Sequence, residues 1–185
     1  YSEISLDYAH KTGAPNMIAS SELTIGAVYQ YRDEREQAID WYLKAYETSK
    51  RGKQPRTEAV ALGNIGLLYA ELKDPGKAVY YLKQSLRIMQ EIGDTLGIAR
   101  SYANIGFNYF EQDMLDSAMT YFQKEVEWAT LADDWNMQGA GLNNIGSVYL
   151  ERNQLSLARQ YFLQSLEIRE TNNDKQGLIN VLENL

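Results

Sequence analysis

The sequence repeats itself every 40 residues. Four residue types recur at this interval, so that each forms a column with one member in every unit. The columns are Gly26, Gly66, Gly106 and Gly146; Ile25, Ile65, Ile105 and Ile145; Tyr29, Tyr69, Tyr109 and Tyr149; and Ala38, Ala78, Ala118 and Ala158. A period of this length is typical of stacked supersecondary units, each of which buries its apolar face against its neighbours. Such a chain offers an extended binding surface before it offers a closed pocket for chemistry.

Each unit contains two stretches of helical periodicity. Leu62, Ile65 and Tyr69 follow one another at intervals of three and four, which indicates the buried stripe of a first helix. Ala78 and Leu82 begin the stripe of a second helix. Between the two stripes lies a short run of turn-forming residues, in which a proline suits the first turn of the second helix. We therefore predict two antiparallel helices per unit.

The punctuation between units sets the frame of the repeat. Every junction pairs a residue that tolerates left-handed backbone, or that caps a helix, with the return of apolar periodicity. The prediction is one repeat domain over residues 1–185, folded as an all-α, right-handed superhelical solenoid of antiparallel helix pairs. Its parts are the second helix of a preceding unit (1–15), four full units (16–55, 56–95, 96–135 and 136–175) and the start of a fifth (176–185).

The repeated glycines are predicted to be packing residues. Glycine inside a helix costs about 1 kcal/mol relative to alanine, so four of them at equivalent places must allow a close approach of helices. The small residue of the alanine column would take the matching part in the second helix, with a large side chain four residues later beside it. These large residues are Tyr42, Leu82, Phe122 and Phe162.

Few residues in the sequence suit nucleophilic or metal chemistry. There is no cysteine, and the one histidine is His10, so neither a catalytic triad nor a Cys/His metal site can be assembled. Adjacent carboxylates such as Asp133 and Asp134 are more typical of a helix cap or a solvated face. We predict no catalytic residue, no metal and no cofactor, in a protein that is not an enzyme.

Negative charge is concentrated in the third and fourth units. The net charge is −7, and residues 101–150 carry seven acidic and one basic side chain, whereas residues 1–100 carry 13 of each. Such a field repels nucleic acid and anionic membranes and would steer a basic partner, although a surface charged for solubility is the alternative. We expect a protein or peptide partner, with no direct contact to nucleic acid and none to a membrane.

The start of the sequence bears on its origin. Tyr1 to Ile4 shows neither an initiator methionine nor a signal-peptide pattern, and no apolar run reaches the roughly 18 residues of a membrane span. We expect a segment cut from a larger protein. A cytoplasmic location is favoured over a periplasmic one, which a preceding signal sequence would indicate.

The pattern of the unit resembles the tetratricopeptide repeat. Counted from residues 19, 59, 99 and 139, Ile at the seventh position, Gly at the eighth, Tyr at the eleventh, Ala at the twentieth and a large apolar residue at the twenty-fourth are similar to that family, here in a 40-residue form. Junction phrases such as Glu91-Ile92-Gly93-Asp94 are most similar to members in bacterial signalling and regulatory proteins. The resemblance implies a sensory or regulatory module that binds an extended protein segment in a concave groove.

The same resemblance implies where the ligand would lie. First helices line the groove, and the sixth position of each unit faces it; this position holds Thr24 and then asparagine in four units. An asparagine amide can pair with the backbone of an extended peptide, but it can equally tie its own helix to a neighbouring one. The groove residues implied are Asn64, Arg100, Asn104, Phe107, Glu111, Asn143, Asn144 and Glu151.

A scaffold or assembly adaptor is the competing interpretation. In that case the convex face or the ends of the stack would make the contacts, including pairing of two copies through the ends. Trp128 and Trp135 would be contact residues, although packing of the third unit on the fourth is the simpler role for them.

Overall fold

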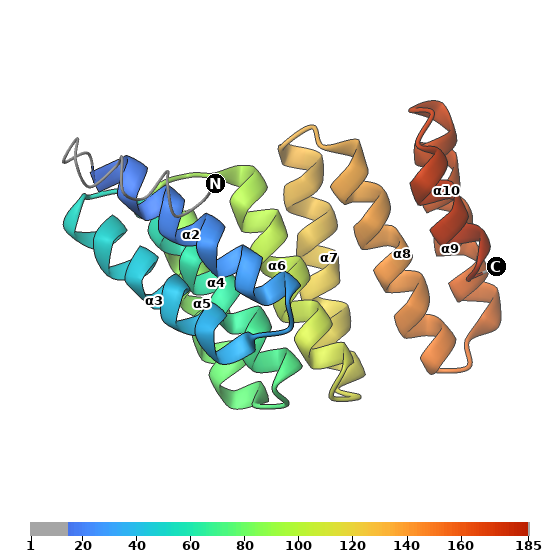
Figure 1. Ribbon diagram of the computed structural model, residues 1–185. Helices are drawn as coiled ribbons and strands as arrows, with labels where there is room; N and C mark the ends of the chain where they lie inside the picture. Colours follow the sequence, from blue (N-terminus) through green and yellow to red (C-terminus); the bar gives the residue numbers. More distant parts are fainter. Residues whose placement is uncertain (1–14, 185) are drawn as a thin grey trace. The chain divides into compact units, whose positions relative to one another are not determined.

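The computed structural model describes residues 15–184 and contains the expected helix pairs. Every regular element in this range is an α-helix, with no strand among the described residues, so the all-α prediction is confirmed (Figure 1). The predicted helix at residues 1–15 falls outside the described range except for Pro15. The helices are α2 (Pro15–Tyr31), α3 (Arg35–Arg51), α4 (Pro55–Glu71), α5 (Pro75–Glu91), α6 (Thr95–Phe110), α7 (Leu115–Leu131), α8 (Trp135–Glu151), α9 (Leu155–Thr171) and α10 (Lys175–Leu182).

The helices begin every 20 residues, which is half of the sequence period. In each turn between them the residue two places before the next helix has a positive φ. In the seven turns where this residue is not glycine, the residue after it donates its N–H to a carbonyl five residues back. Asp74 N to Tyr69 O, at 2.9 Å, is one such bond. This is the Schellman arrangement, which satisfies carbonyls left open at a helix end. The positive-φ residues are Asp33, Lys53, Lys73, Gly93, Asp113, Asp133, Asn153 and Asn173.

The junction glycines only partly behave as expected. Gly93 is left-handed, with φ 68°, but Gly52 has φ −78° and Lys53 takes the left-handed place instead. Pro75 occupies the first turn of α5, as expected. Four helices also have an aspartate whose side chain accepts a hydrogen bond from the N–H three residues on, at 2.8–3.1 Å, which stabilises the helix start. These caps are Asp74, Asp94, Asp134 and Asp174.

The glycine column lies where two helices of a pair touch. A Cβ added to Gly106 would lie 2.7 Å from the ring of Phe122, a distance that leaves no room for it. The other three glycines are equally close to the large residue of their own second helix, which confirms the predicted close approach. Those pairs are Gly26 with Tyr42 (2.7 Å), Gly66 with Leu82 (2.8 Å) and Gly146 with Phe162 (2.5 Å).

The tyrosine column forms a second contact within the pairs. Its rings are half-buried and stack on a tyrosine of the following helix, with centroids 5.3–5.5 Å apart. Stacked rings of this kind bury apolar area between the two helices of a pair. The stacked pairs are Tyr69 with Tyr81, Tyr109 with Tyr121, and Tyr149 with Tyr161.

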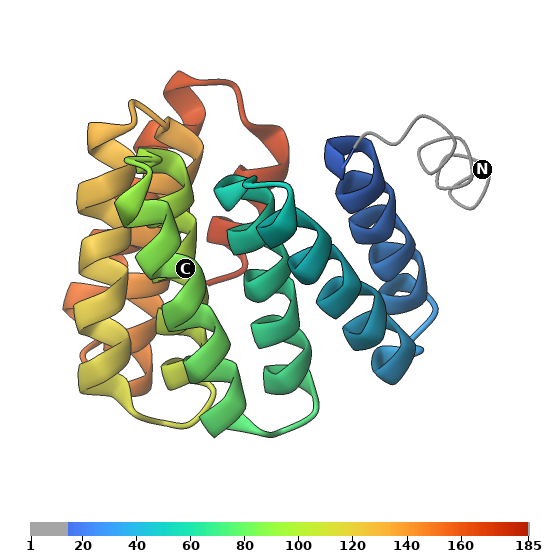
Figure 2. The same ribbon diagram turned by 90° about the vertical axis from the view of Figure 1, so that its left-hand side faces the viewer.

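The chain divides into two compact units, residues 1–93 and 94–185. Within each unit, every helix packs on the next one along the chain (Figure 2). First helices of successive pairs also touch each other: α2 contacts α4 in one unit, and α6 contacts α8 in the other. Each unit therefore presents two first helices side by side.

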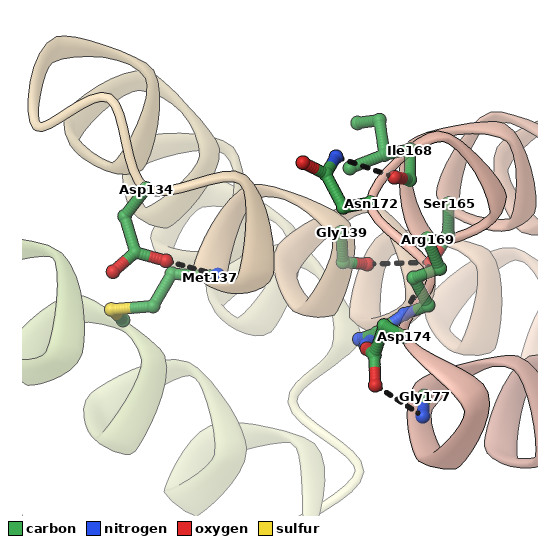
Figure 3. A network of polar contacts seen from close by, with 9 residues as sticks. All are labelled: Asp134, Met137, Gly139, Ser165, Ile168, Arg169, Asn172, Asp174 and Gly177. Carbon is green, nitrogen blue, oxygen red and sulfur yellow. Dashed lines mark hydrogen bonds and ion pairs between the residues drawn. The ribbon is translucent and has the colours of Figure 1, made fainter.

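A buried polar network around Arg169 joins three helices in the second unit (Figure 3). The Arg169 side chain on α9 is 8% exposed, and its guanidinium pairs with Asp174 at 2.5 Å. Asp174 in turn caps α10 through the N–H of Gly177. A Cβ on Gly177 would overlap with Nη1 of Arg169 and Oδ2 of Asp174, so a larger residue there would displace this ion pair. On the same helix, Ser165 donates to the carbonyl of Gly139 on α8 at 2.7 Å.

Candidate peptide-binding face

The stripe predicted on α6 is open to solvent. Arg100, Asn104 and Phe107 follow one another at intervals of four and three, so they share one side of the helix, and Glu111 continues the stripe at the helix end. Arg100 and Glu111 are exposed, Asn104 is half-buried and Phe107 is 53% exposed. The opposite side of the helix is buried against its neighbours. α6 thus presents a large apolar ring between polar groups.

A second stripe lies on α8, the neighbouring first helix. Asn143 and Asn144 are half-buried, and Glu151, two turns further on, is exposed. Because α6 contacts α8 and α7 packs on both, the predicted residues of the third and fourth units lie on adjacent helices. Asn64 belongs to the other unit, where α4 lies beside α2, and it too is half-buried. We refer to the two stripes in residues 94–185 as the α6–α8 face.

The asparagine column, uniform in sequence, divides in the structure. Asn144 donates from Nδ2 to Glu125 Oε2 at 3.2 Å, and Asn184 donates to Asn143 Oδ1 at 3.1 Å. These two tie their helix to another one. Asn64 and Asn104, by contrast, make no side-chain hydrogen bond to any part of the chain from 15 to 184. Asn104 is therefore a member whose amide is available to a ligand.

Glu125 is a buried carboxyl that the sequence analysis missed. It lies on α7 with 1% of its surface exposed, and burial raises its pKa from 4.5 to about 8, against a smaller lowering by the hydrogen bond from Asn144. The signal lay in the 40-residue register, where Glu125 replaces Ala45, Ser85 and Ser165. A large acid in a column of small residues marks a place where the packing differs.

Several acidic side chains of the two units are paired. In the first unit, Glu71 accepts from Arg35 at 3.1 Å and from Gln30 at 3.4 Å, so its charge is compensated. In the second unit, Arg152 pairs with Asp116. Glu151 remains an exposed carboxylate on α8.

A separate cleft lies on the second-helix side of the first unit. Its volume is about 360 Å³, and it is bounded by α3, α4 and α5. Tyr80, which is 58% exposed, stands at its edge against the ring of Tyr81. Residues of both charge signs line it, among them Lys50 and Glu58. The cleft combines an aromatic wall with a mixed polar rim.

Two further features bear on function. Within residues 15–184, no group of three or more His, Cys, Asp or Glu side chains is placed to hold a metal ion. None of the helices described is long and apolar enough to cross a membrane.

His10, the one histidine, lies outside the described residues. Trp128 is half-buried, and Trp135 at the start of α8 is 38% exposed.

Residues 17–91 and 97–171 each match the family model of the tetratricopeptide repeat. No curated protein matches the sequence. Three similar solved structures are the apo form of RapI (20% identity, 97% of this chain and 51% of that one, TM-score 0.80), a Rap protein complexed with competence and sporulation factor (13%, 88% and 45%, 0.81), and a signal transduction ATPase with a tetratricopeptide repeat sensor from Pyrococcus horikoshii (16%, 98% and 29%, 0.79). The chain spans about half of the two Rap proteins and less of the ATPase. The shared fold is a helical solenoid.

Proposed function

Because the chain belongs to the tetratricopeptide repeat family, we propose that its α6–α8 face binds an extended protein segment. The fold is typically a non-catalytic protein-interaction module, and no catalytic family is indicated. We further propose that this module is the sensory or regulatory part of a larger bacterial signalling protein. Binding on the face would then shift the conformations available to the helix pairs, and other parts of the protein would respond.

Phe107 carries the proposal. This side chain lies on a first helix and is 53% exposed, so about half of its apolar surface is not used in packing. Asn104, one turn before it, has a free amide, and Arg100 is exposed one turn earlier. An aromatic anchor beside polar groups is the arrangement that dominates the energy of many interfaces. An extended peptide could place one apolar side chain on Phe107 while its backbone pairs with Asn104.

The charge of this region favours a basic segment. Residues 101–150 carry seven acidic and one basic side chain. Two of those acids contribute little, since Asp116 is paired with Arg152 and Glu125 holds its proton at neutral pH. The remaining negative charge still outweighs the positive, and it would speed the approach of a basic peptide at low ionic strength.

The test begins with a displayed library of random peptides, selected on the whole chain. Phe107→Ala and Asn104→Ala are each expected to raise the Kd of a selected peptide by about tenfold, the loss typical of a central contact. Leu131→Ala, which truncates a side chain 64% exposed on α7, is the matched control and is expected to leave the Kd unchanged. Thermal unfolding of all three variants checks that the fold is intact.

The library has two outcomes that would contradict the proposal. One is that no peptide is selected over a library passed on an unrelated helical protein. The other is that selected peptides bind Phe107→Ala and Leu131→Ala equally well. Asn144→Ala is unsuited to this test, because it would also leave Glu125 buried without its hydrogen bond.

The cleft on the second-helix side supports a second candidate function. Its volume of about 360 Å³ and its exposed Tyr80 favour an adaptor that holds a partner side chain between α3 and α5. In that case Tyr80→Ala would weaken binding of the selected peptide and Phe107→Ala would not. The same set of variants therefore separates the two functions.

A further inference from the structure

The hydrogen bond between Glu125 and Asn144 links a buried acid to the proposed binding face. We infer that Glu125 is a positioning residue that holds the amide nitrogen of Asn144 inward, so that Asn144 offers its carbonyl oxygen to the ligand. The α8 side of the face would then select a hydrogen-bond donor, such as a backbone N–H or an amine. This inference rests on the proposed function.

The geometry shows that the contact is built into the packing. Glu125 is 1% exposed, and its Oε2 lies 3.2 Å from Nδ2 of Asn144 on the neighbouring helix. Space for the acid comes from Gly141, one turn before Asn144: a Cβ there would lie 3.2 Å from Cδ of Glu125 and 2.7 Å from Val126. In the preceding and following registers this place holds Ala61, Ser101 and Val181, each with a Cβ. A large acid therefore faces the one glycine of its column.

The equivalent residues of other units bond differently. Ser85 and Ser165, in the register of Glu125, each donate at 2.7 Å to a carbonyl in the first helix of their own pair, namely Ala59 and Gly139. Glu125 instead contacts the first helix of the next pair. Where the other units have a serine that bonds within its own helix pair, this unit has a glutamate that bonds to Asn144, a residue of the binding face.

The chemistry of the acid decides which way the amide points. A carboxylate can only accept, so it requires the NH₂ group of Asn144 and leaves Oδ1 for the ligand. A neutral acid can also donate, and it could turn Oδ1 inward and NH₂ outward. Because the pKa of Glu125 is about 8, the ionised form takes over above that pH, and binding of a donor ligand is expected to strengthen as the pH rises.

No charged side chain is among the causes that shift the pKa of Glu125. The helices packed on α7 are α6 and α8, and burial and the Asn144 bond are the two causes that act on the pKa of Glu125. The titratable side chains on the three helices are Arg100, Tyr102 and Tyr109 on α6, Asp116, Tyr121, Lys124 and Glu127 on α7, and Tyr149 and Glu151 on α8.

Asn104 is the internal comparison. It has the same place in its unit as Asn144, but its amide is not held by any residue in the described chain. It can rotate to offer either its oxygen or its NH₂ group. Asn104 should therefore accept both donors and acceptors at any pH, whereas Asn144 should discriminate between them once Glu125 is ionised. Because Glu125 contacts Asn144 and not Asn104, this selectivity is confined to the α8 side of the face.

The first experiment needs no ligand. The side-chain NH₂ resonances of Asn144, assigned by their loss in Asn144→Ser, are followed by NMR from about pH 6 to about pH 9.5, a range that spans the raised pKa. They are expected to shift with a single midpoint in the wild-type protein and to stay constant in Glu125→Gln. The resonances of Asn104 serve as the control. A flat Asn144 profile, or the same midpoint in Glu125→Gln, would overturn the inference.

The second experiment uses a peptide selected from the library. Between about pH 6.5 and about pH 9.5 its affinity for the wild-type protein is expected to rise about three- to tenfold, the range for one hydrogen bond. Glu125→Gln should bind without this pH dependence. Glu125→Ser, which introduces the residue type of Ser85 and Ser165 at this place, should also lose it, and thermal unfolding checks that this variant is folded. Equal pH profiles in all three proteins would overturn the inference.

The two proposals fail in different ways. If Asn104→Ala weakens binding while Glu125→Gln keeps the wild-type pH profile, the binding face stands and the role of Glu125 is overturned. If the resonances of Asn144 follow Glu125 but no peptide is selected, the contact is real and the proposed function is overturned.

Discussion

At the scale of single residues, the turns depend on a backbone conformation that L-amino acids disfavour. In the described part of the chain, seven non-glycine residues have φ between 53° and 63°, and Gly93 meets the same need without steric strain. Left-handed backbone costs an L-residue about 1 kcal/mol or more, with asparagine and aspartate least affected. Lys53 is neither a glycine nor an asparagine or aspartate, so its left-handed backbone carries this cost in full. Glycine at such a position should therefore raise the free energy of unfolding.

We predict opposite effects at two turns. Lys53→Gly should raise the free energy of unfolding by about 0.5–1 kcal/mol, and Gly93→Ala should lower it by about 1 kcal/mol. Urea unfolding followed by circular dichroism measures both. Gly76→Ala is the matched control: a Cβ has room at Gly76 as at Gly93, but its φ is not positive, so this variant should not be destabilised. Equal losses at Gly76 and Gly93 would contradict the explanation by φ.

A second prediction at this scale concerns the pH dependence of stability. The pKa of Glu125 is about 8 in the folded chain and about 4.5 when unfolded, so between these values the folded state binds more protons. The stabilisation is complete below about pH 4.5 and is lost as the pH rises through about 8, by up to about 1.4 kcal/mol per unit. Glu125→Gln should remove this slope.

The measurement is urea unfolding of the wild-type protein and Glu125→Gln at about pH 6 and about pH 9, on either side of the raised pKa. The variant should gain stability relative to wild type at the higher pH. Glu127→Gln makes the same change at an exposed site of α7 and should track the wild-type protein at both values. A constant difference between wild type and Glu125→Gln would show that the carboxyl does not titrate in this range.

At the scale of the helices, each pair is closed by a glycine pressed against a large side chain. Two glycines of α4 separate this effect from helix propensity. A Cβ on Gly66 would lie 2.8 Å from Leu82 and 3.1 Å from the backbone oxygen of Ala78, whereas on Gly63 it would meet only Ser85, at 3.4 Å. The two positions lie in the same helix, one turn apart, and differ in what stands opposite.

We predict that Gly66→Ala destabilises the chain by about 1–3 kcal/mol through overpacking. Gly63→Ala should be neutral or stabilising by up to about 1 kcal/mol, since alanine is the better helix former. Differential scanning calorimetry of both variants is the measurement. If the two alanines have the same effect, close approach is not the reason for the glycine column.

Contacts inside a helix pair could be predicted from the sequence, and contacts between pairs could not. The close approach at Gly106 followed from the cost of glycine in a helix and from the large residue at Phe122, which repeat together. Glu125 and Arg169 occur once each, and their partners, Asn144 and Asp174, lie on different helices. The 40-residue repeat shows which residues are equivalent, but not which residues of other helices lie opposite them. For the same reason four identical asparagines gave no sign that Asn144 and Asn184 would be engaged.

At the scale of the whole molecule, the chain consists of two compact units that meet in sequence at Gly93 and Asp94. The second contains α6 to α10 with the α6–α8 face. We predict that residues 94–185, expressed alone, are helical and unfold cooperatively, because each helix of this unit packs on the next one within it. Circular dichroism during thermal unfolding tests this.

The control is a shorter fragment, residues 115–185, which starts at α7. It keeps Phe122 but lacks the glycine that Phe122 covers, Gly106, and so exposes a large apolar face. This fragment should aggregate or melt without cooperativity. If residues 94–185 behave in the same way, the unit is not independently stable.

The turns described above have a consequence for how such an array can change length. The backbone repeats every 20 residues, but the side chains that face each other repeat every 40. Excising residues 56–95 would leave each remaining glycine with its own large partner. Excising only 75–94 would join α4 to α6 through a turn of the right form, yet Ile98 would then occupy the place of the fully buried Ala78. Duplication, loss or engineering of this array should therefore proceed in pairs of helices, even though each helix is joined to the next in the same way.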